Sequence, residues 1–245
     1  MTSALKYGLL TLWLIFPFAF IAALTANKYY RSEESANTVL RLKSWFFILA
    51  VFTSLFILPV PAACFLLFCI LCLAFKEVYR AAKKHFSGFV YYIFFILFLC
   101  IFCGGCLFFF KGGKELFFFV TVCVQLNDIF QYLWGKSTGK TPLAVKISPN
   151  KTLEGFLGGM FTTALLSFFT APYFTGLKGI YAFAAGIILA CLGLSGDLTV
   201  SALKRKLNIK DMGNILAGHG GITDRADSLL YITPLALAYL YFNLP

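Results

Sequence analysis

The sequence predicts an all-α, polytopic membrane protein that forms one integral membrane domain over residues 1–245. Three observations lead to this prediction. The mean hydropathy is +0.84, only 13% of the residues are charged, and apolar runs as long as a membrane span recur along the chain. Because one soluble core of this size cannot bury so much apolar surface, we expect lipid to cover most of it.

Five apolar runs have the roughly 20 residues that a helix needs to cross a bilayer. They cover residues 8–26, 89–110, 115–134, 153–174 and 179–198. A shorter run, residues 228–242, is expected to enter the bilayer tilted or incompletely.

The apolar stretch 45–75 is too long for one span and short for two, and it contains Pro59 and Pro61 at its centre. The distribution of Lys and Arg distinguishes the two interpretations, because these residues accumulate in cytoplasmic loops. If the prolines form a tight turn between two short helices, 17 of the 21 Lys and Arg residues lie in loops on one side, at 27–44, 76–88, 135–152 and 199–227. With a single span this number falls to 14. We therefore predict about eight transmembrane helices and place these loops in the cytoplasm.

The net charge of +11 is spread along loops at one membrane face. This pattern reflects topology and suits anionic membrane lipids or a polyanionic substrate, so we expect no nucleic-acid partner. We expect an integral protein of the cell inner membrane.

Six of the ten acidic residues lie between Asp128 and Asp227, and the topology places them near the cytoplasmic ends of the last four helices. A carboxylate at membrane depth is costly and usually faces the bundle interior or a water-filled cavity. Any one of them could form a salt bridge with a neighbouring lysine. The whole set, converging with many cations, better fits a site for phosphates and Mg²⁺, because Lys and Arg neutralise phosphate oxygens and carboxylates hold the metal. The sequence thus predicts catalytic helices and loops in residues 115–245, whereas residues 1–110 form helices of unassigned role.

The stretch 201–227, SALKRKLNIKDMGNILAGHGGITDRAD, resembles the signature of the phosphatidate cytidylyltransferases, also called CDP-diacylglycerol synthases. The positions that match are Ser201, Lys204, Arg205, Lys210, Asp211, His219, Gly220, Gly221, Asp224, Arg225 and Asp227. Upstream, the resemblance extends to the pair Gly196 and Asp197, to the block ISPNKTLEGFLGG from Ile147, and to a segment with Asp128, Tyr132, Gly135, Gly139 and Lys140. It covers the C-terminal half of the chain.

Three positions depart from the family pattern. Ala217 replaces a proline, Ala226 replaces a larger apolar residue, and Gln131 replaces a small one. None of them removes a charged member of the signature. They indicate a divergent branch and leave the exact lipid acceptor open.

The resemblance implies the transfer of a cytidylyl group from CTP to phosphatidate or a related lipid phosphate at the cytoplasmic membrane face, with release of pyrophosphate. It implies Mg²⁺ on Asp197 and Asp224, with Asp128 and Asp227 as further ligands or orienting groups, and leaves a second cation open. The implied catalytic residues are completed by the cations Lys204, Arg205, Lys210 and Arg225 and by His219. Substrate binding is expected from Ser201, Lys140, Ser148, Lys151, Gly220 and Gly221.

The role of His219 is open between a general base and a phosphate contact or loop-ordering group. A phosphate monoester is mostly ionised near neutral pH and needs no base, so we favour the second role.

Two other functions are compatible with parts of this pattern. A CTP-dependent polyprenol or lipid-alcohol kinase would share a CTP site but would transfer the terminal phosphoryl group. A membrane transporter would use buried Asp and Lys residues for passage and would not turn over nucleotide. Acyl-chain preference and oligomeric state, a homo-oligomer included, are not determined by these patterns.

Overall fold

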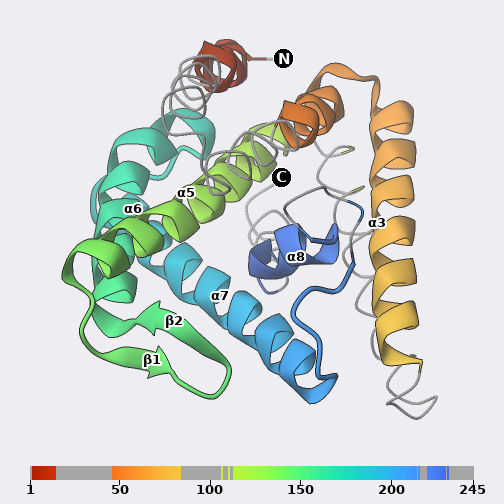
Figure 1. Cartoon of the computed structure of the whole chain (residues 1–245). Coiled ribbons are helices and arrows are strands. Elements are labelled where there is room, and N and C mark those ends of the chain that lie inside the picture. The colour runs from red at the N-terminus through yellow and green to blue at the C-terminus, as the bar shows by residue number, and fades with distance from the viewer. Residues whose placement is uncertain are drawn as a thin grey trace, which may run out of the picture.

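The computed structural model describes residues 2–14, 46–83, 106, 110, 113–213, 215, 220–229 and 231. Within these ranges the long helices are α3 (Val60–Ala82), α5 (Lys114–Thr138), α6 (Leu153–Phe174) and α7 (Gly179–Lys206), with shorter helical segments at residues 3–14 and Phe46–Ile57. The C-terminal part contains the short helix α8 (Thr223–Ala226) and the 3-10 turn η1 (Asp227–Leu229). Figure 1 shows α5, α6 and α7 crossing one another on one side, while α3 stands on the other side with α8 between α3 and α7.

Within the described ranges, the four long helices are apolar and long enough to cross a membrane. The predicted span 153–174 coincides with α6, and the spans 115–134 and 179–198 lie within α5 and α7. The predicted span 89–110 lies outside the described residues except for Cys106 and Phe110, as does most of 8–26 and of 228–242. The total of about eight spans stays a prediction.

The turn predicted at Pro59 is confirmed, because one helix ends at Ile57 and α3 begins at Val60. The Lys114 ammonium donates hydrogen bonds to the carbonyl oxygens of Phe56 and Leu58, at 3.3 and 3.4 Å, and so holds the end of the first helix. The prediction of two short helices is only partly right. No glycine or proline follows Pro61 in α3, so this helix continues to Ala82 through residues 76–82, which the sequence assigned to a loop.

Close packing of α5 against α6 depends on the glycines of the segment GFLGG. A Cβ atom on Gly155 would lie 2.7 Å from the carbonyl oxygen of Gln131, and one on Gly159 would lie 2.5 Å from Gln131 Cγ. One helical turn before Gln131, Asn127 accepts a 3.2 Å hydrogen bond from Thr163 Oγ1. Small residues and an interhelical polar contact are the means by which helices associate within lipid.

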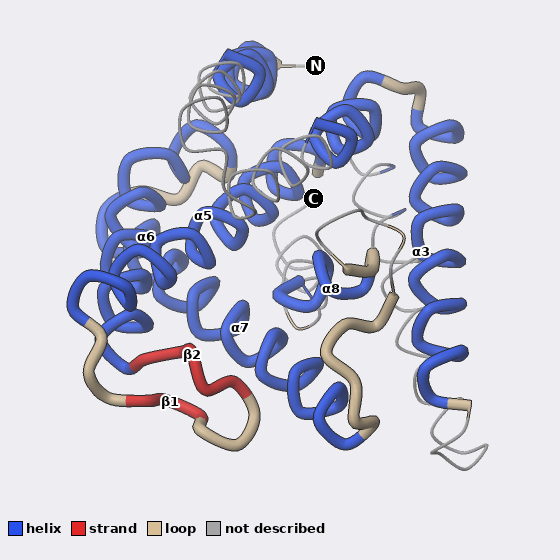
Figure 2. The backbone as a smooth tube through the Cα atoms, viewed as in Figure 1, coloured by secondary structure: helices blue, strands red, loops and turns tan. Residues whose placement is uncertain are grey.

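The described residues are mostly helical, as predicted, but the connection between α5 and α6 adds two short strands that the sequence analysis did not expect. Residues that were assigned to a cytoplasmic loop form an antiparallel hairpin of β1 (Pro142–Ala144) and β2 (Ser148–Thr152), shown as the two strands in Figure 2. The carboxylate of Glu154 in the first turn of α6 accepts hydrogen bonds from the backbone N–H groups of Lys140 and Thr141, both at 3.0 Å. These bonds fix the start of the hairpin to α6.

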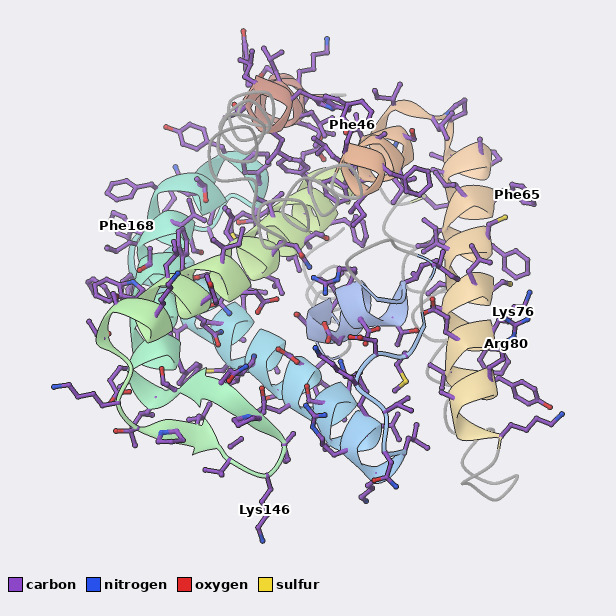
Figure 3. The ribbon with its side chains drawn as sticks, viewed as in Figure 1. Phe46, Phe65, Lys76, Arg80, Lys146 and Phe168 are labelled. Carbon is purple, nitrogen blue, oxygen red and sulfur yellow. The ribbon has the colours of Figure 1, made fainter. Side chains whose placement is uncertain are left out.

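The outer surface has an apolar body and a basic end. Figure 3 shows Phe65 on α3 and Phe168 on α6 at the outside of the bundle, where their side chains are 68% and 40% exposed. In the same view, Lys146 projects beyond the hairpin, at the end where α3 and α7 also finish, while Lys76 and Arg80 project outward from the side of α3. In the described part of the chain, three of the loop regions predicted to share a side therefore lie at one end.

Candidate active site

The C-terminal turns of α7 provide one face of the site. Asp197, Ser201 and Lys204 are spaced four and three residues apart, which places them on the same side of the helix. The turn η1 packs directly on this face at Gly196, where a Cβ atom would clash with the carbonyl oxygen of Asp227. The glycine of the Gly-Asp pair thus allows the end of the signature to approach α7.

Asp197 joins α7 to the hairpin. Its Oδ2 atom lies 2.5 Å from the ammonium of Lys151 on β2, and its Oδ1 accepts a 3.1 Å hydrogen bond from the Ser201 hydroxyl. The Lys151 and Asp197 side chains are 21% and 22% exposed, so water and ligands can reach this pair. The structure therefore brings the predicted residues Lys151, Asp197 and Ser201 together.

Asp224 is more deeply enclosed, with its side chain 3% exposed. Its Oδ1 atom lies 3.0 Å from the ammonium of Lys204, and its Oδ2 accepts hydrogen bonds from the backbone N–H groups of Met212 and Gly221, both at 2.9 Å. The preceding Gly220 has φ +82°, a conformation that favours glycine and permits the chain to turn into this arrangement. Both carboxylate oxygens of Asp224 are therefore engaged in holding the loop.

Asp128 and Asp227 meet through Ser228. The Ser228 hydroxyl donates a 2.7 Å hydrogen bond to Asp128 Oδ2, and the Ser228 N–H donates a 2.9 Å bond to Asp227 Oδ1. Burial, and after it the carboxylate of Asp197, raises the pKa of Asp227 to about 7, although Lys204 acts in the opposite direction. Carboxylates from α5, α7 and η1 thus influence one another at one end of the bundle.

The oxygen-rich donor set fits Mg²⁺ better than a soft metal. Asp128 Oδ1 is buried and has no hydrogen-bond partner in the described structure, as expected of an atom that awaits a ligand. Within the described residues, no three His, Cys, Asp or Glu side chains are grouped tightly enough to hold a metal alone. This is compatible with Mg²⁺, which usually binds through one or two carboxylates and completes its shell with water and substrate phosphates.

The other predicted cations differ in their contacts and exposure. Arg205 Nε donates a 3.1 Å hydrogen bond to the carbonyl oxygen of Ile147 and so ties α7 to the hairpin. Lys140, Lys210 and Arg225 are exposed, and Ser148 is half-buried on β2. His219 lies outside the described residues. The roles predicted for these residues in binding and catalysis stay predictions.

The sequence analysis assigned no site residue to the N-terminal half and missed Glu77. This residue of α3 is 5% exposed and accepts hydrogen bonds from the backbone N–H groups of Ile222 and Thr223, at 3.1 and 3.0 Å. The position of Glu77 in the helix could have indicated its burial, since Ala74 and Val78 belong to the same buried face of α3. Its neighbours Lys76 and Arg80 made the segment look like a solvated loop.

The arrangement can be compared with known proteins. The sequence matches the family model described as the cytidylyltransferase family over residues 2–243. It is 42% identical over 132 residues to the uncharacterized protein YnbB of Escherichia coli (strain K12), covering 54% of this chain and 43% of that protein.

Two proteins named phosphatidate cytidylyltransferase are also similar. The protein of Aquifex aeolicus (strain VF5) is 44% identical over 112 residues, covering 46% of this chain and 42% of the relative. The protein of Bacillus subtilis (strain 168) is 43% identical over 133 residues, covering 54% of this chain and 48% of the relative. The matched segments thus span less than half of the length of each of these three relatives.

Proposed function

Because the chain belongs to the cytidylyltransferase family, we propose that it transfers the cytidylyl group of CTP to phosphatidate or a related lipid phosphate at the cytoplasmic face of the membrane. The products are CDP-diacylglycerol and pyrophosphate. The observation that carries the proposal is the pairing of two lysines with two carboxylates from separate parts of the chain, Lys151 with Asp197 and Lys204 with Asp224. The names of the relatives from Aquifex aeolicus and Bacillus subtilis support the same reaction.

Two polyanions must meet for this reaction, and the described cations suit that task. Lys151 and Lys204 are held in place by carboxylates, while Arg205 is held by the hairpin. Lys140, Lys210 and Arg225 are exposed. We assign these residues to the phosphates of CTP and of the lipid, because Lys and Arg form charge-assisted hydrogen bonds with phosphate oxygens.

The transfer step needs no strong base in the protein. An oxygen of the lipid phosphate attacks the α-phosphorus of CTP, and the bond between this phosphorus and the bridging oxygen to the β-phosphorus breaks. The electron pair leaves with pyrophosphate. Since a phosphate monoester is mostly ionised near neutral pH, its oxygen is already a nucleophile. We therefore assign His219 to phosphate contact or loop ordering.

Mg²⁺ is the cofactor that we propose, and when bound it supplies charge neutralisation on the transferred and departing phosphates. Asp197 is the most available carboxylate to hold it, because its side chain is 22% exposed whereas that of Asp224 is 3% exposed. Asp128 and Asp227 lie beside it. Asp224 would have to exchange its contact with Lys204 for the metal.

The lipid substrate fits the position of the site. The helices bury their polar contacts inside and expose aromatic side chains, among them Phe161 and Phe169 on α6, which are 56% and 66% exposed. The lysine–carboxylate pairs lie at the end of α7 where polar side chains replace this apolar surface. A lipid headgroup that stays in the bilayer would present its phosphate at this level.

A turnover assay with the purified protein tests the proposal. The protein is incubated with CTP and Mg²⁺ and with a panel of lipids that contains phosphatidate, other lipid phosphates, diacylglycerol and a polyprenol. We expect a CDP-lipid and pyrophosphate from phosphatidate or another lipid phosphate. Release of CDP with phosphorylation of a lipid alcohol would identify a kinase instead, and the absence of nucleotide turnover with every lipid would contradict the proposal.

A further inference from the structure

Glu77 places a buried carboxylate from the N-terminal half of the chain against the glycine-containing signature. One oxygen, Oε1, accepts a 3.1 Å hydrogen bond from the N–H of Ile222. The other, Oε2, accepts bonds from the N–H and the hydroxyl of Thr223, at 3.0 and 3.1 Å. The Thr223 hydroxyl also lies 3.2 Å from the carbonyl oxygen of Ala74, one turn earlier in α3. Two residues of α3 thus hold the start of α8.

The same carboxylate touches the chain on both sides of residues 214–219. A Cβ atom on Gly213 would lie 2.5 Å from Glu77 Oε1, and one on Gly221 would lie 2.5 Å from Oε2. Asp224 bridges the same two stems, since its Oδ2 accepts hydrogen bonds from Met212 on one side and Gly221 on the other. Glu77 and Asp224 therefore form a two-carboxylate clamp that joins the chain at residues 212–213 to the chain at Gly221.

The chemistry of Glu77 indicates more than packing. A buried carboxylate is costly unless several hydrogen bonds compensate it, and an apolar side chain could fill the space without this cost. The three donors at Glu77 come from Ile222 and Thr223, adjacent residues that lead directly into Asp224. The carboxylate thus determines where the backbone of this segment lies, and through it the position of the pair formed by Asp224 and Lys204.

We propose that Glu77 is a positioning residue for cytidylyl transfer, acting through the signature segment and not by contact with the reacting atoms. The inference rests on the proposed function, and within it we assign the positioned pair, Lys204 and Asp224, to the side of the site that holds the CTP phosphates. It also gives a role to a helix of the region 1–110. The hydrogen bond from Thr223 joins Glu77 to the signature across 146 positions of the sequence.

Glu77→Gln is the primary test, because it keeps the shape of the side chain but turns one oxygen into an N–H₂ group that faces backbone donors. Outer groups that orient ligands typically contribute about 10-fold to 100-fold to activity. We expect kcat/KM for CTP to fall by about this factor, with a higher KM for CTP and an unchanged KM for the lipid phosphate. Glu115→Gln is the matched control, because its carboxylate contacts the Thr2 hydroxyl at 2.9 Å in the first turn of α5. We expect the control to keep the unaltered activity.

The KM values distinguish positioning from a general loss of structure. A variant that is merely less stable has fewer active molecules, so kcat falls while both KM values stay unchanged, and this result would overturn the proposal. Activity within twofold of the unaltered protein would overturn it as well. If Glu77→Gln does not fold, Thr223→Val replaces it, since valine lacks the hydroxyl but keeps the N–H bond to Glu77. We expect the same selective rise in the KM for CTP, of smaller size, and an unchanged KM for CTP would contradict the proposal.

Hydrogen exchange provides a second measurement that needs no turnover. In Glu77→Gln we expect faster amide exchange in peptides that cover residues 209–226 and unchanged exchange in α5 and α6. Unchanged exchange at residues 209–226 would refute the clamp. The absence of CTP turnover in the unaltered protein, together with the expected change in exchange, would instead refute the proposed function and leave the clamp in place.

Discussion

The effect of Asp224→Asn on thermal stability tests whether this carboxylate has a structural role in addition to its predicted catalytic role. The two oxygens of Asp224 face donors only, with Lys204 on Oδ1 and the N–H groups of Met212 and Gly221 on Oδ2. An asparagine has one oxygen and one N–H₂ group. In either orientation of the amide, a donor therefore faces a donor in a site where the side chain is 3% exposed.

The expected loss of stability is large. Breaking a buried ion pair from one side typically costs about 3 to 5 kcal/mol, because the remaining charge stays buried without its partner. In a chain of this length, this corresponds to a fall in Tm of roughly 6 to 20 °C. Turnover is lost too, since Lys204 and the loop no longer have their fixed positions.

Asp197→Asn is the matched control. The pair formed by Asp197 and Lys151 is about one-fifth exposed, and an asparagine oxygen can still accept the hydrogen bond from Ser201. Partly exposed ion pairs contribute about 1 kcal/mol or less, so we expect Tm to change by no more than about 4 °C. We nevertheless expect turnover to be abolished, because the charge that would hold Mg²⁺ is gone.

Thermal unfolding of the detergent-purified variants, followed by tryptophan fluorescence, compares the two changes directly. The account predicts inactive proteins with clearly different Tm values. Equal Tm values for Asp224→Asn and the unaltered protein would refute the assignment of Asp224 to the clamp. Near-normal turnover of Asp197→Asn at ordinary Mg²⁺ concentrations would refute its assignment to the metal.

Three further predictions concern the pH dependence of stability, the role of His219 and the membrane topology. The raised pKa of Asp227, about 7, means that the folded protein holds a proton that an unfolded Asp releases near pH 4. The contribution of Asp227 to stability is therefore lost as pH rises from about 4 to about 7. In metal-free buffer, Tm is expected to fall over this range, and Asp227→Asn to reduce the fall; an equal pH dependence of both proteins would contradict this. A general base typically contributes about 100-fold to 10,000-fold to the rate, and we expect His219→Gln to lose far less activity than this. The variant should also keep the acid limb of the pH–rate profile, which reflects ionisation of the lipid phosphate. Disappearance of that limb with a loss of activity near 10,000-fold would identify His219 as the base. Single cysteines at Val60 and Lys146 should be labelled from opposite sides of the membrane, and labelling of both from the cytoplasm would contradict the predicted topology, in which the turn at Pro59 faces away from the cytoplasm.

Several features of the fold could be predicted because they depend on local chemistry. A proline cannot continue a helix with a full set of hydrogen bonds, so Pro59 and Pro61 identify the break before α3. Glycines four residues apart in an apolar helix allow close approach of a neighbour, and Gly155 and Gly159 indeed pack against Gln131. Spans of suitable length and hydropathy are likewise local properties.

Other features depend on contacts between distant segments. The bonds between Glu77 and Thr223 join residues 146 positions apart, and no pattern around Glu77 alone identifies its partner. The hairpin of residues 142–152 depends on the anchoring of its first residues by Glu154. The sequence identified Asp224 as important but could not show that both of its oxygens are used by Lys204 and the loop.

The fate of the CTP phosphates tests the central claim most directly. Parallel reactions of the purified protein with phosphatidate, Mg²⁺ and CTP labelled in either the α- or the γ-phosphate distinguish transfer of the cytidylyl group from transfer of a phosphoryl group. The account predicts that the α-label enters the lipid product, that the γ-label leaves in pyrophosphate, and that Asp197→Asn abolishes both signals. Appearance of the γ-label in the lipid, with the α-label released in CDP, would contradict the account.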